Sequence, residues 1–180
     1  MAFPQPGTPA PAFTAKDQNG QTVKLQDFKG TKLVLYFYPK DDTPGCTAQA
    51  CSLRDNYRAL QKAGYQIIGI STDDEKRHTR FRQKYNLPFT LLADTDKKVH
   101  EAYGTWIKKS MYGREYMGTA RVTFLINAKG LIEEVIEKVN TKEHAAQIMG
   151  EAPATKPAAK APKKAAVKKA AAKKAVAKKK

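Results

Sequence analysis

Two uninterrupted apolar segments dominate the hydrophobic pattern of the chain. Residues 32–38 read Lys-Leu-Val-Leu-Tyr-Phe-Tyr and are followed by Pro39, and residues 65–71 read Tyr-Gln-Ile-Ile-Gly-Ile-Ser. Continuous apolar runs of this length, rich in β-branched and aromatic residues, are typical of strands buried on both faces of a sheet. We therefore expect these two segments to be central strands.

Helical patterns follow each of these strands. Between residues 46 and 63, Leu53, Tyr57 and Leu60 recur at offsets of four and three, which places them on one helix face, and Gly64 ends the pattern. A second helix is expected to begin at Asp73-Asp74 and to end before Pro88. A short strand over residues 89–93 and a short helix over residues 96–103 follow.

Two hairpins complete the pattern. The first surrounds Asn19-Gly20, a pair typical of hairpin turns, between residues 13–15 and 22–25. The second joins residues 121–126 to residues 131–137, and a last helix is expected from about Lys142 to Gly150. Two strand–helix–strand crossovers beside antiparallel pairs predict an α/β fold with a mixed central sheet and helices on both faces. With its N-terminal β-hairpin, this is a thioredoxin-like arrangement.

The charge of the chain is concentrated at one end. The 180 residues carry a formal net charge of +16, of which residues 151–180 contribute +10 through 11 lysines and one glutamate. We therefore divide the chain into a folded domain over residues 1–150 and a basic tail over residues 151–180. Domains of roughly 100–150 residues are the commonest size and bury a substantial core.

Several classes of protein are excluded by what the sequence lacks. No segment approaches the ~18 apolar residues of a membrane helix, and residues 1–7 lack the basic and apolar regions of a signal peptide. Two cysteines cannot form a disulfide framework, and three scattered histidines make no zinc site with them. We expect a cytoplasmic protein without metal, in which a close cysteine pair is more often redox-active than structural.

Cys46 is the first candidate for chemistry. It follows Pro44-Gly45 at the predicted start of a helix, beyond the end of a central strand, which is where open α/β sheets place their sites. Free N–H groups and the positive end of the dipole at a helix N-terminus favour a thiolate, the nucleophilic form of cysteine. Taken singly, each residue has a plainer interpretation: a helical cysteine as a small buried apolar group, Thr43 as a helix cap, and Pro39 as a strand terminator.

Cys51 lies five residues after Cys46. In an intact helix this offset rotates a side chain by about 140° and advances it by about 7.5 Å. The two Cα atoms then lie beyond the ~7 Å limit for a disulfide. A Cys46–Cys51 bond therefore requires the first turns of the helix to unwind, and we predict an element that is helical when reduced and locally unfolded when oxidised.

The run Pro39-x-x-x-Thr43-x-x-Cys46 resembles the active-site signature of the peroxiredoxins, thiol peroxidases with a thioredoxin-like fold. A second cysteine five residues further on resembles the branch called peroxiredoxin Q or bacterioferritin comigratory protein. The likeness extends over about residues 5–148 and includes Tyr36-Phe37-Tyr38-Pro39 and the segment 121–126, which begins with Arg121.

The resemblance implies a role for each of these residues. Cys46 is implied to be the peroxidatic nucleophile that attacks hydrogen peroxide or an organic hydroperoxide and becomes a sulfenic acid. Thr43 would bond the peroxide, Pro39 would shield the sulfur from water, and Arg121 would stabilise the thiolate and orient the oxygens. Arg54 is the nearest rival cation in sequence, but it stands about 12 Å along the helix from Cys46.

The resemblance also implies how the enzyme is recycled. Cys51 would be the resolving cysteine, which gives an intrachain disulfide with Cys46, and thioredoxin or a similar dithiol protein would reduce that bond by exchange. This sulfur chemistry needs neither a metal nor an organic cofactor. The branch implies a monomer. A competing disulfide oxidoreductase function is disfavoured, because such enzymes resemble Cys-x-x-Cys and here four residues intervene.

The basic tail suggests a second kind of partner. From Pro153 onward only Ala, Lys, Pro, Thr and Val occur, with lysine pairs at a period of five that resembles linker-histone tails. Such a segment cannot form a packed core, and we expect it to be disordered alone. It could bind DNA or RNA without sequence specificity and so associate with the nucleoid. The logarithm of the affinity for duplex DNA would then fall by about 0.9 for each phosphate neutralised per unit increase in the logarithm of the salt concentration. The alternatives are a solvated polycation, or a nucleic-acid-binding protein in which the domain is a passive body.

Overall fold

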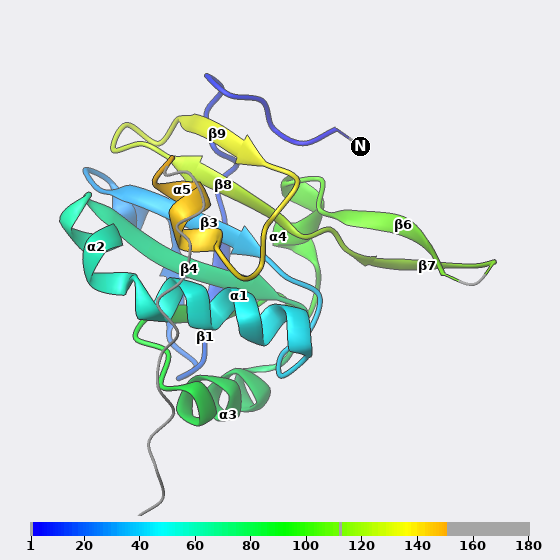
Figure 1. The fold of residues 1–180 in the computed structure, drawn as a ribbon. Coiled ribbons are helices and arrows are strands. Elements are labelled where there is room, and N and C mark those ends of the chain that lie inside the picture. The colour runs from blue at the N-terminus through cyan, green and yellow to red at the C-terminus, as the bar shows by residue number, and fades with distance from the viewer. Residues whose placement is uncertain (1, 112, 151–180) are drawn as a thin grey trace, which may run out of the picture.

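A computed structural model describes residues 2–111 and 113–150 (Figure 1). The strands of the described residues are β1 Thr14–Asp17, β2 Thr22–Lys24, β3 Lys32–Phe37, β4 Tyr65–Ser71, β5 Thr90–Ala93, β6 Trp106–Met111, β7 Arg114–Thr119, β8 Val122–Ile126 and β9 Ile132–Ile136. The helices are α1 Pro44–Asp55, α2 Tyr57–Lys62, α3 Glu75–Tyr85, α4 Lys98–Ala102 and α5 His144–Ile148, with a 3-10 turn η1 over Leu25–Phe28.

The main sheet has seven strands in the order β2-β1-β5-β4-β3-β8-β9. Strands β3, β4 and β5 run parallel in its centre, whereas β8 and β1 join its two sides in antiparallel pairings. This confirms the mixed sheet that the sequence predicts, including the two buried central strands and both hairpins. The right-handed crossovers of parallel strands need helices between them, and α1–α2 and α3 fill those places.

Helices cover both faces of the sheet. On one face, Val34 and Tyr36 of β3 pack into a core with Leu53 of α1 and Ile148 of α5. On the opposite face, Phe37 packs with residues of α4 and of the N-terminal segment. Alternate residues of β3 therefore enter two separate cores, which explains why its sequence is apolar without interruption. These features confirm a thioredoxin-like fold.

The helix expected over residues 46–63 is two helices. The first begins at Pro44, two residues earlier than expected, so Cys46 is its third residue. The chain then breaks at Asn56, whose side-chain amide donates to the carbonyl oxygen of Ser52 at 2.9 Å. Because the Asn56 amide occupies this carbonyl and the backbone departs from helical angles there, α2 starts anew at Tyr57. The last helix, α5, is also shorter than expected and begins at His144 rather than Lys142.

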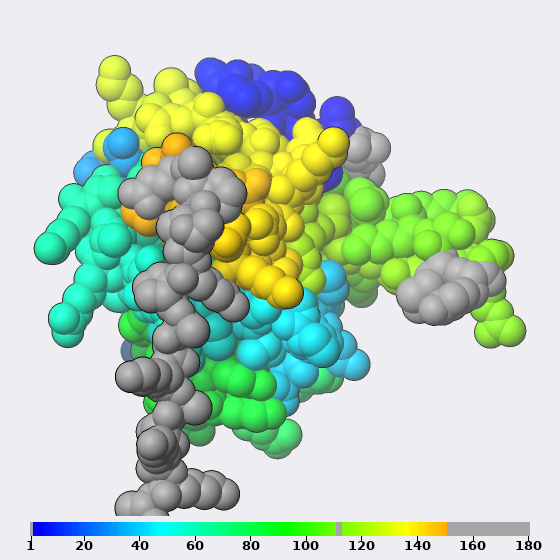
Figure 2. Space-filling model, viewed as in Figure 1, coloured from blue at the N-terminus to red at the C-terminus, as the bar shows by residue number. Residues whose placement is uncertain are grey.

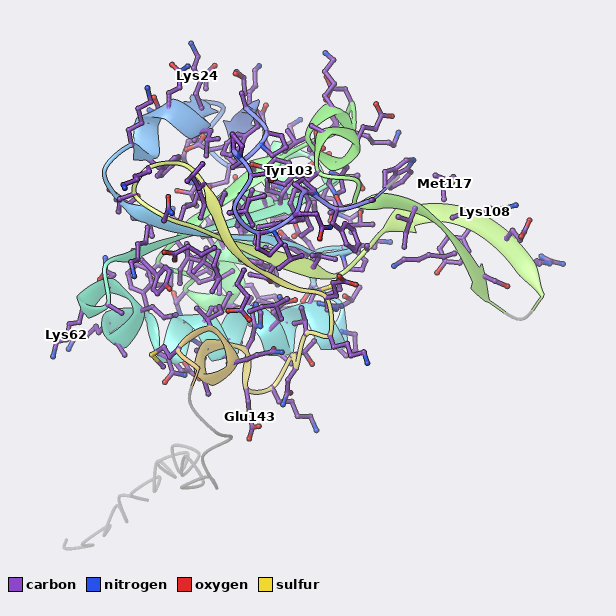
Figure 3. The ribbon with its side chains drawn as sticks, turned by 90° about the horizontal axis from the view of Figure 1, so that it is seen from above. Lys24, Lys62, Tyr103, Lys108, Met117 and Glu143 are labelled. Atoms are coloured by element: carbon purple, nitrogen blue, oxygen red, sulfur yellow. The ribbon has the colours of Figure 1, made fainter. Side chains whose placement is uncertain are left out.

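The hairpin β6–β7 is an element that the hydrophobic pattern does not predict. It pairs Trp106 with Thr119 and extends from the body of the molecule as an arm (Figures 1 and 2). Figure 3 labels Lys108 and Met117 on this arm, away from the main sheet. Most described side chains of β7 are exposed, so the alternation of buried and polar positions that identifies a strand is absent.

Two predictions concern residues outside the described part of the chain. The basic tail over residues 151–180 lies outside the described residues, and so does its expected disorder. Within the described part, no helix has the length and apolar character needed to cross a membrane. No group of three or more His, Cys, Asp or Glu side chains there is arranged to hold a metal ion.

Candidate active site

Cys46 lies in the first turn of α1, directly beyond the loop that follows the central strand β3. Thr43 is the N-cap residue and Pro44 the first helical residue, a position that proline favours because its missing N–H would have had no helical partner. The side chain of Cys46 is only 2% exposed, and both cysteines are free thiols. The sequence thus places a buried sulfur at the N-terminal end of a helix dipole.

Arg121 approaches this sulfur from the opposite side of the site. It precedes β8, the antiparallel neighbour of β3, and its Nη2 donates to Sγ of Cys46 at 3.4 Å. A Cβ atom on Gly45 would lie 3.3 Å from the same Nη2, so the glycine leaves room for the guanidinium. Residues 75 positions apart in the sequence therefore meet because β3 and β8 are adjacent in the sheet.

Gln49 is a site residue that the sequence analysis missed. Its Oε1 accepts a hydrogen bond from Nη1 of Arg121 at 2.6 Å, and its side chain is fully buried. The guanidinium thus spans Cys46 and Gln49, which lie three residues apart on one face of α1. That spacing was the available signal, but an isolated glutamine in a helix is normally an exposed residue.

Thr43 and Pro39 both belong to the loop beside the sulfur and are half-buried. The hydroxyl of Thr43 donates to the carbonyl oxygen of Lys40 at 3.1 Å, which is a bond within this loop. Pro39 follows Tyr38, whose N–H still donates to the β4 carbonyl of Ile70 at 3.1 Å. The loop therefore leaves the sheet at Pro39 and reaches the helix cap at Thr43.

Arg54, the rival cation, is engaged elsewhere. Its Nη2 lies 2.8 Å from the carboxylate of Asp55, and its Nη1 donates to the carbonyl oxygen of Tyr85 at 2.8 Å. The geometry therefore favours Arg121 over Arg54 as the cation at Cys46.

Cys51 is half-buried and lies on the same intact helix as Cys46. Burial raises the pKa of its thiol; Arg54 has a smaller opposite effect, and Asp55 adds to the rise. In this conformation Cys51 is therefore held as a thiol, and the helix keeps it about 7.5 Å along the axis from Cys46.

Buried polar groups lie near the Cys46–Arg121 pair. Burial, followed by the charges of Asp41 and Cys46, raises the pKa of Tyr36 well above its ordinary value, so its phenol is neutral. Thr123 Oγ1 lies 2.9 Å from Nε2 of His144, and burial lowers the pKa of that histidine to about 4. At neutral pH both Tyr36 and His144 are therefore uncharged, and neither adds a charge beside Arg121.

A thioredoxin-like sheet with a buried helix-start cysteine hydrogen-bonded by an arginine defines the class of thiol peroxidases. Comparison with known proteins agrees. The AhpC/TSA family model matches residues 6–135. The chain is 50% identical over 144 residues to a putative peroxiredoxin bcp of Coxiella burnetii. This alignment covers 80% of this chain and 95% of that protein.

Two further relatives give the same result. Peroxiredoxin Bcp of Escherichia coli is 49% identical over 138 residues, 77% of this chain and 88% of that protein. A solved structure of Xanthomonas campestris peroxiredoxin Q superposes with a TM-score of 0.73 at 33% identity, over 77% of this chain and 87% of that one. The chain therefore belongs to the peroxiredoxin Bcp/PrxQ family and is a peroxidase, an oxidoreductase. The comparisons do not support the alternative of a nucleic-acid-binding protein with a passive domain.

Proposed function

We propose that Cys46 is the peroxidatic nucleophile of this enzyme and Cys51 its resolving cysteine. The observation that carries the proposal is the bond from Arg121 Nη2 to the buried Sγ of Cys46 at 3.4 Å. An arginine is always charged and presents several donors, so it can hold a negative sulfur and an oxygen of the substrate together. Thr43 and Pro39, which delimit the loop beside the sulfur, orient the peroxide and limit access of water.

The first step forms a sulfur–oxygen bond. The Cys46 thiolate attacks the terminal oxygen of a hydroperoxide, the O–O bond breaks, and the leaving alkoxide takes a proton to become an alcohol, or water from hydrogen peroxide. Cys46 is thereby oxidised to a sulfenic acid. Donors directed at the oxygens stabilise the charge that passes to the leaving group, and Arg121 is placed to supply them.

The second step forms the disulfide. The sulfur of Cys51 attacks Sγ of Cys46, the S–O bond breaks, and the hydroxyl leaves as water with a proton from Cys51. A dithiol protein such as thioredoxin then attacks the disulfide, and exchange restores both thiols while the reductant becomes oxidised. Each cycle therefore converts one hydroperoxide and one dithiol to an alcohol, water and a disulfide.

Organic hydroperoxides are proposed substrates beside hydrogen peroxide. The Xanthomonas campestris bacterioferritin comigratory protein, which shares 33% identity with this chain, has alkyl peroxide reduction activity. Cys46 is itself part of an apolar core that also contains Leu53 and Phe89, and an apolar environment of this kind is compatible with a substrate that carries an alkyl group.

The deciding experiment measures peroxide consumption with thioredoxin, thioredoxin reductase and NADPH. We expect Cys46→Ser to abolish consumption. Cys51→Ser should still form one sulfenic acid per chain but should not be recycled by thioredoxin. Full consumption by Cys46→Ser would overturn the assignment of the nucleophile, and thioredoxin-dependent turnover by Cys51→Ser would overturn that of the resolving residue.

We also propose that residues 1–150 form the complete peroxidase domain, monomeric and cytoplasmic, and that residues 151–180 add contact with DNA or RNA. The support for this contact is the net charge of +10 within those thirty residues. Truncation after Gly150 should keep peroxidase activity and abolish retention on DNA at low salt. Unchanged DNA retention after truncation would refute the role of the tail.

A further inference from the structure

Asp41 anchors the middle of the loop between β3 and α1. Its carboxylate is 3% exposed and accepts a hydrogen bond through Oδ1 from the hydroxyl of Tyr38 at 2.7 Å. Its Oδ2 lies 2.7 Å from Nδ1 of His78 on α3. The backbone N–H of Asp41 donates to Oδ2 of Asp73, at the end of β4, at 2.6 Å. The loop is thus tied at one residue to α3 and to the segments that follow β3 and β4.

His78 connects this anchor to the sheet. The imidazole is fully buried, and its Nε2 lies 3.0 Å from the carbonyl oxygen of Leu92 in β5. A carbonyl oxygen can only accept a hydrogen bond, and so can an ionised carboxylate. A neutral imidazole has one N–H, so only a ring with both nitrogens protonated satisfies Leu92 and the Asp41 carboxylate together.

The surroundings of the ring suit such an imidazolium. The hydroxyl of Tyr38, 3.5 Å from Nδ1, donates to Oδ1 of Asp41, which satisfies that oxygen and leaves Oδ2 for the ring. Asp73, the other nearby carboxylate, is itself paired with Arg77 at 3.1 Å. A buried charge is tolerated when it is paired and its N–H groups are all bonded, and both conditions hold for His78.

A second contact from α3 holds the next residue of the loop. Asp42 has a left-handed backbone with φ of +57°, which is unfavourable for a residue other than glycine. Its carboxylate accepts from Lys84 Nζ at 2.7 Å and from the hydroxyl of Tyr85 at 2.5 Å. Two consecutive loop residues are therefore fixed by side chains of α3, which lies below α1 in Figure 1.

We propose that His78 is a positioning residue of the peroxidase, acting as an imidazolium that bonds Asp41 to Leu92. Pro39 and Thr43 lie two residues before and after Asp41 in the loop that leads from β3 to Cys46, so the anchor restrains both residues and the start of α1. This inference rests on the proposed role of Cys46. A displacement of about 1 Å in a group that orients a substrate is enough to slow a reaction by about a hundredfold.

The chain contains a matched control for this role. His100 is also fully buried, and its Nδ1 lies 2.5 Å from Oδ2 of Asp94. Its Nε2 has no hydrogen-bond partner among the described residues, and its ring packs against Phe37 in the core on the other face of the sheet. Substitution of His100 therefore disturbs a buried His–Asp pair without touching the loop beside Cys46.

The experiment measures the rate at which hydrogen peroxide oxidises Cys46 in a single turnover of the reduced full-length chain. We expect His78→Gln to lower the second-order rate constant by about ten- to a hundredfold. His100→Gln should keep the wild-type rate in its folded fraction. Equal rates for wild type and His78→Gln would overturn the inference alone, whereas absence of Cys46 oxidation in the wild type would overturn the proposed function with it.

Two further readouts separate positioning from a general loss of structure. Nitrogen NMR of the reduced wild type should detect protons on both ring nitrogens of His78 at pH 7, assigned by comparison with His78→Gln. In a double-mutant cycle with Asp41→Asn, the second substitution should add little to the loss of rate caused by the first, because His78 acts through Asp41. One unprotonated ring nitrogen, or fully additive effects on log rate, would overturn the inference.

Discussion

Arg121 donates to Oε1 of Gln49 at 2.6 Å, and Gln49 lies one helical turn after Cys46 on α1. The arginine therefore contacts both the sulfur and the helix that carries the sulfur. Because Gln49 accepts from Nη1, Nη2 is left directed at Sγ. The position of the cation depends on α1 being folded through at least residue 49.

We expect loss of the Gln49 acceptor to slow the reaction of Cys46 with peroxide. Gln49→Ala leaves Nη1 without this partner and frees the guanidinium to move, and the rate constant should fall by about tenfold, less than removal of a donor itself would cause. Gln49→Glu keeps an oxygen acceptor for Nη1, but its negative charge competes with the thiolate for the guanidinium, so this variant should also react more slowly than the wild type. The measurement is single-turnover oxidation of Cys46.

The control for this substitution is Gln61→Ala, at an exposed glutamine of α2. It removes the same amide without touching Arg121 and should leave the rate unchanged. A Gln49→Ala variant as fast as this control would contradict the role given to Gln49.

Replacement of Arg121 by lysine tests the shape of the cation rather than its charge. Lysine has no planar fork, so it cannot bond Gln49 and Cys46 in the same geometry. We expect Arg121→Lys to lower the rate constant with peroxide by about a hundredfold, the scale of losing one donor at a reacting oxygen. Arg54→Lys keeps the charge of a cation directed at Asp55 and Tyr85 and should react like the wild type; a similar loss in both variants would refute the assignment.

The sequence predicts those parts of the fold whose residues carry a local signal. Strand β3 is identified because it is buried on both faces, and the loop from Pro39 to Cys46 because its residues are close together in the chain. The arm β6–β7 escapes prediction because most described side chains of β7 are exposed, so no alternation marks it. Its largest exposed apolar side chains, Tyr116 and Met117, are 45% and 50% exposed.

Those residues of the candidate site that are distant from Cys46 in the sequence are predictable only through the resemblance. Nothing local in the sequence marks Arg121, which reaches Cys46 through the pairing of β3 with β8. Gln49 and His78 are harder still, because each is polar and fully buried. Their burial depends on partners far along the chain, since His78 meets Asp41 across 37 positions.

The buried His144 should make the stability of the domain depend on pH. Burial lowers its pKa from an ordinary value of 6.5 to about 4 in the folded state. Between pH 6.5 and pH 4, His144 therefore binds a proton in the unfolded chain but not in the folded chain. The contribution of neutral His144 to the free energy of unfolding is complete above about pH 6.5 and is lost as the pH falls toward 4. At about 1.4 kcal/mol per unit, the free energy of unfolding should drop by about 3 kcal/mol.

The measurement compares urea unfolding of the wild type and His144→Gln at pH 7 and pH 4. Glutamine can still bond Thr123 but takes up no proton, so its stability should fall less than that of the wild type over this range. The difference between the two falls isolates His144 from other groups that titrate there. Identical falls would contradict the assignment.

Formation of the Cys46–Cys51 disulfide should unfold the start of α1. In the reduced structure both cysteines lie on one continuous helix, where an offset of five residues holds their Cα atoms beyond bonding range. We expect amide hydrogens of residues 46–56 to be protected in the reduced protein and to exchange faster by at least about tenfold after oxidation. Mass spectrometry of peptides from this segment measures the change.

The unwinding of α1 on oxidation should not extend to the loop that His78, Lys84 and Tyr85 hold through Asp41 and Asp42. Amide hydrogens of α3, which holds Asp41 and Asp42, should keep the same protection in both redox states. Cys51→Ser treated with one equivalent of peroxide provides the control, because it forms the sulfenic acid but has no partner for an intrachain bond. Its residues 46–56 should remain protected. An intact helix holds the two Cα atoms too far apart for a disulfide. Similar protection of this segment in reduced and disulfide-bonded wild type would therefore contradict the prediction that the start of α1 unwinds.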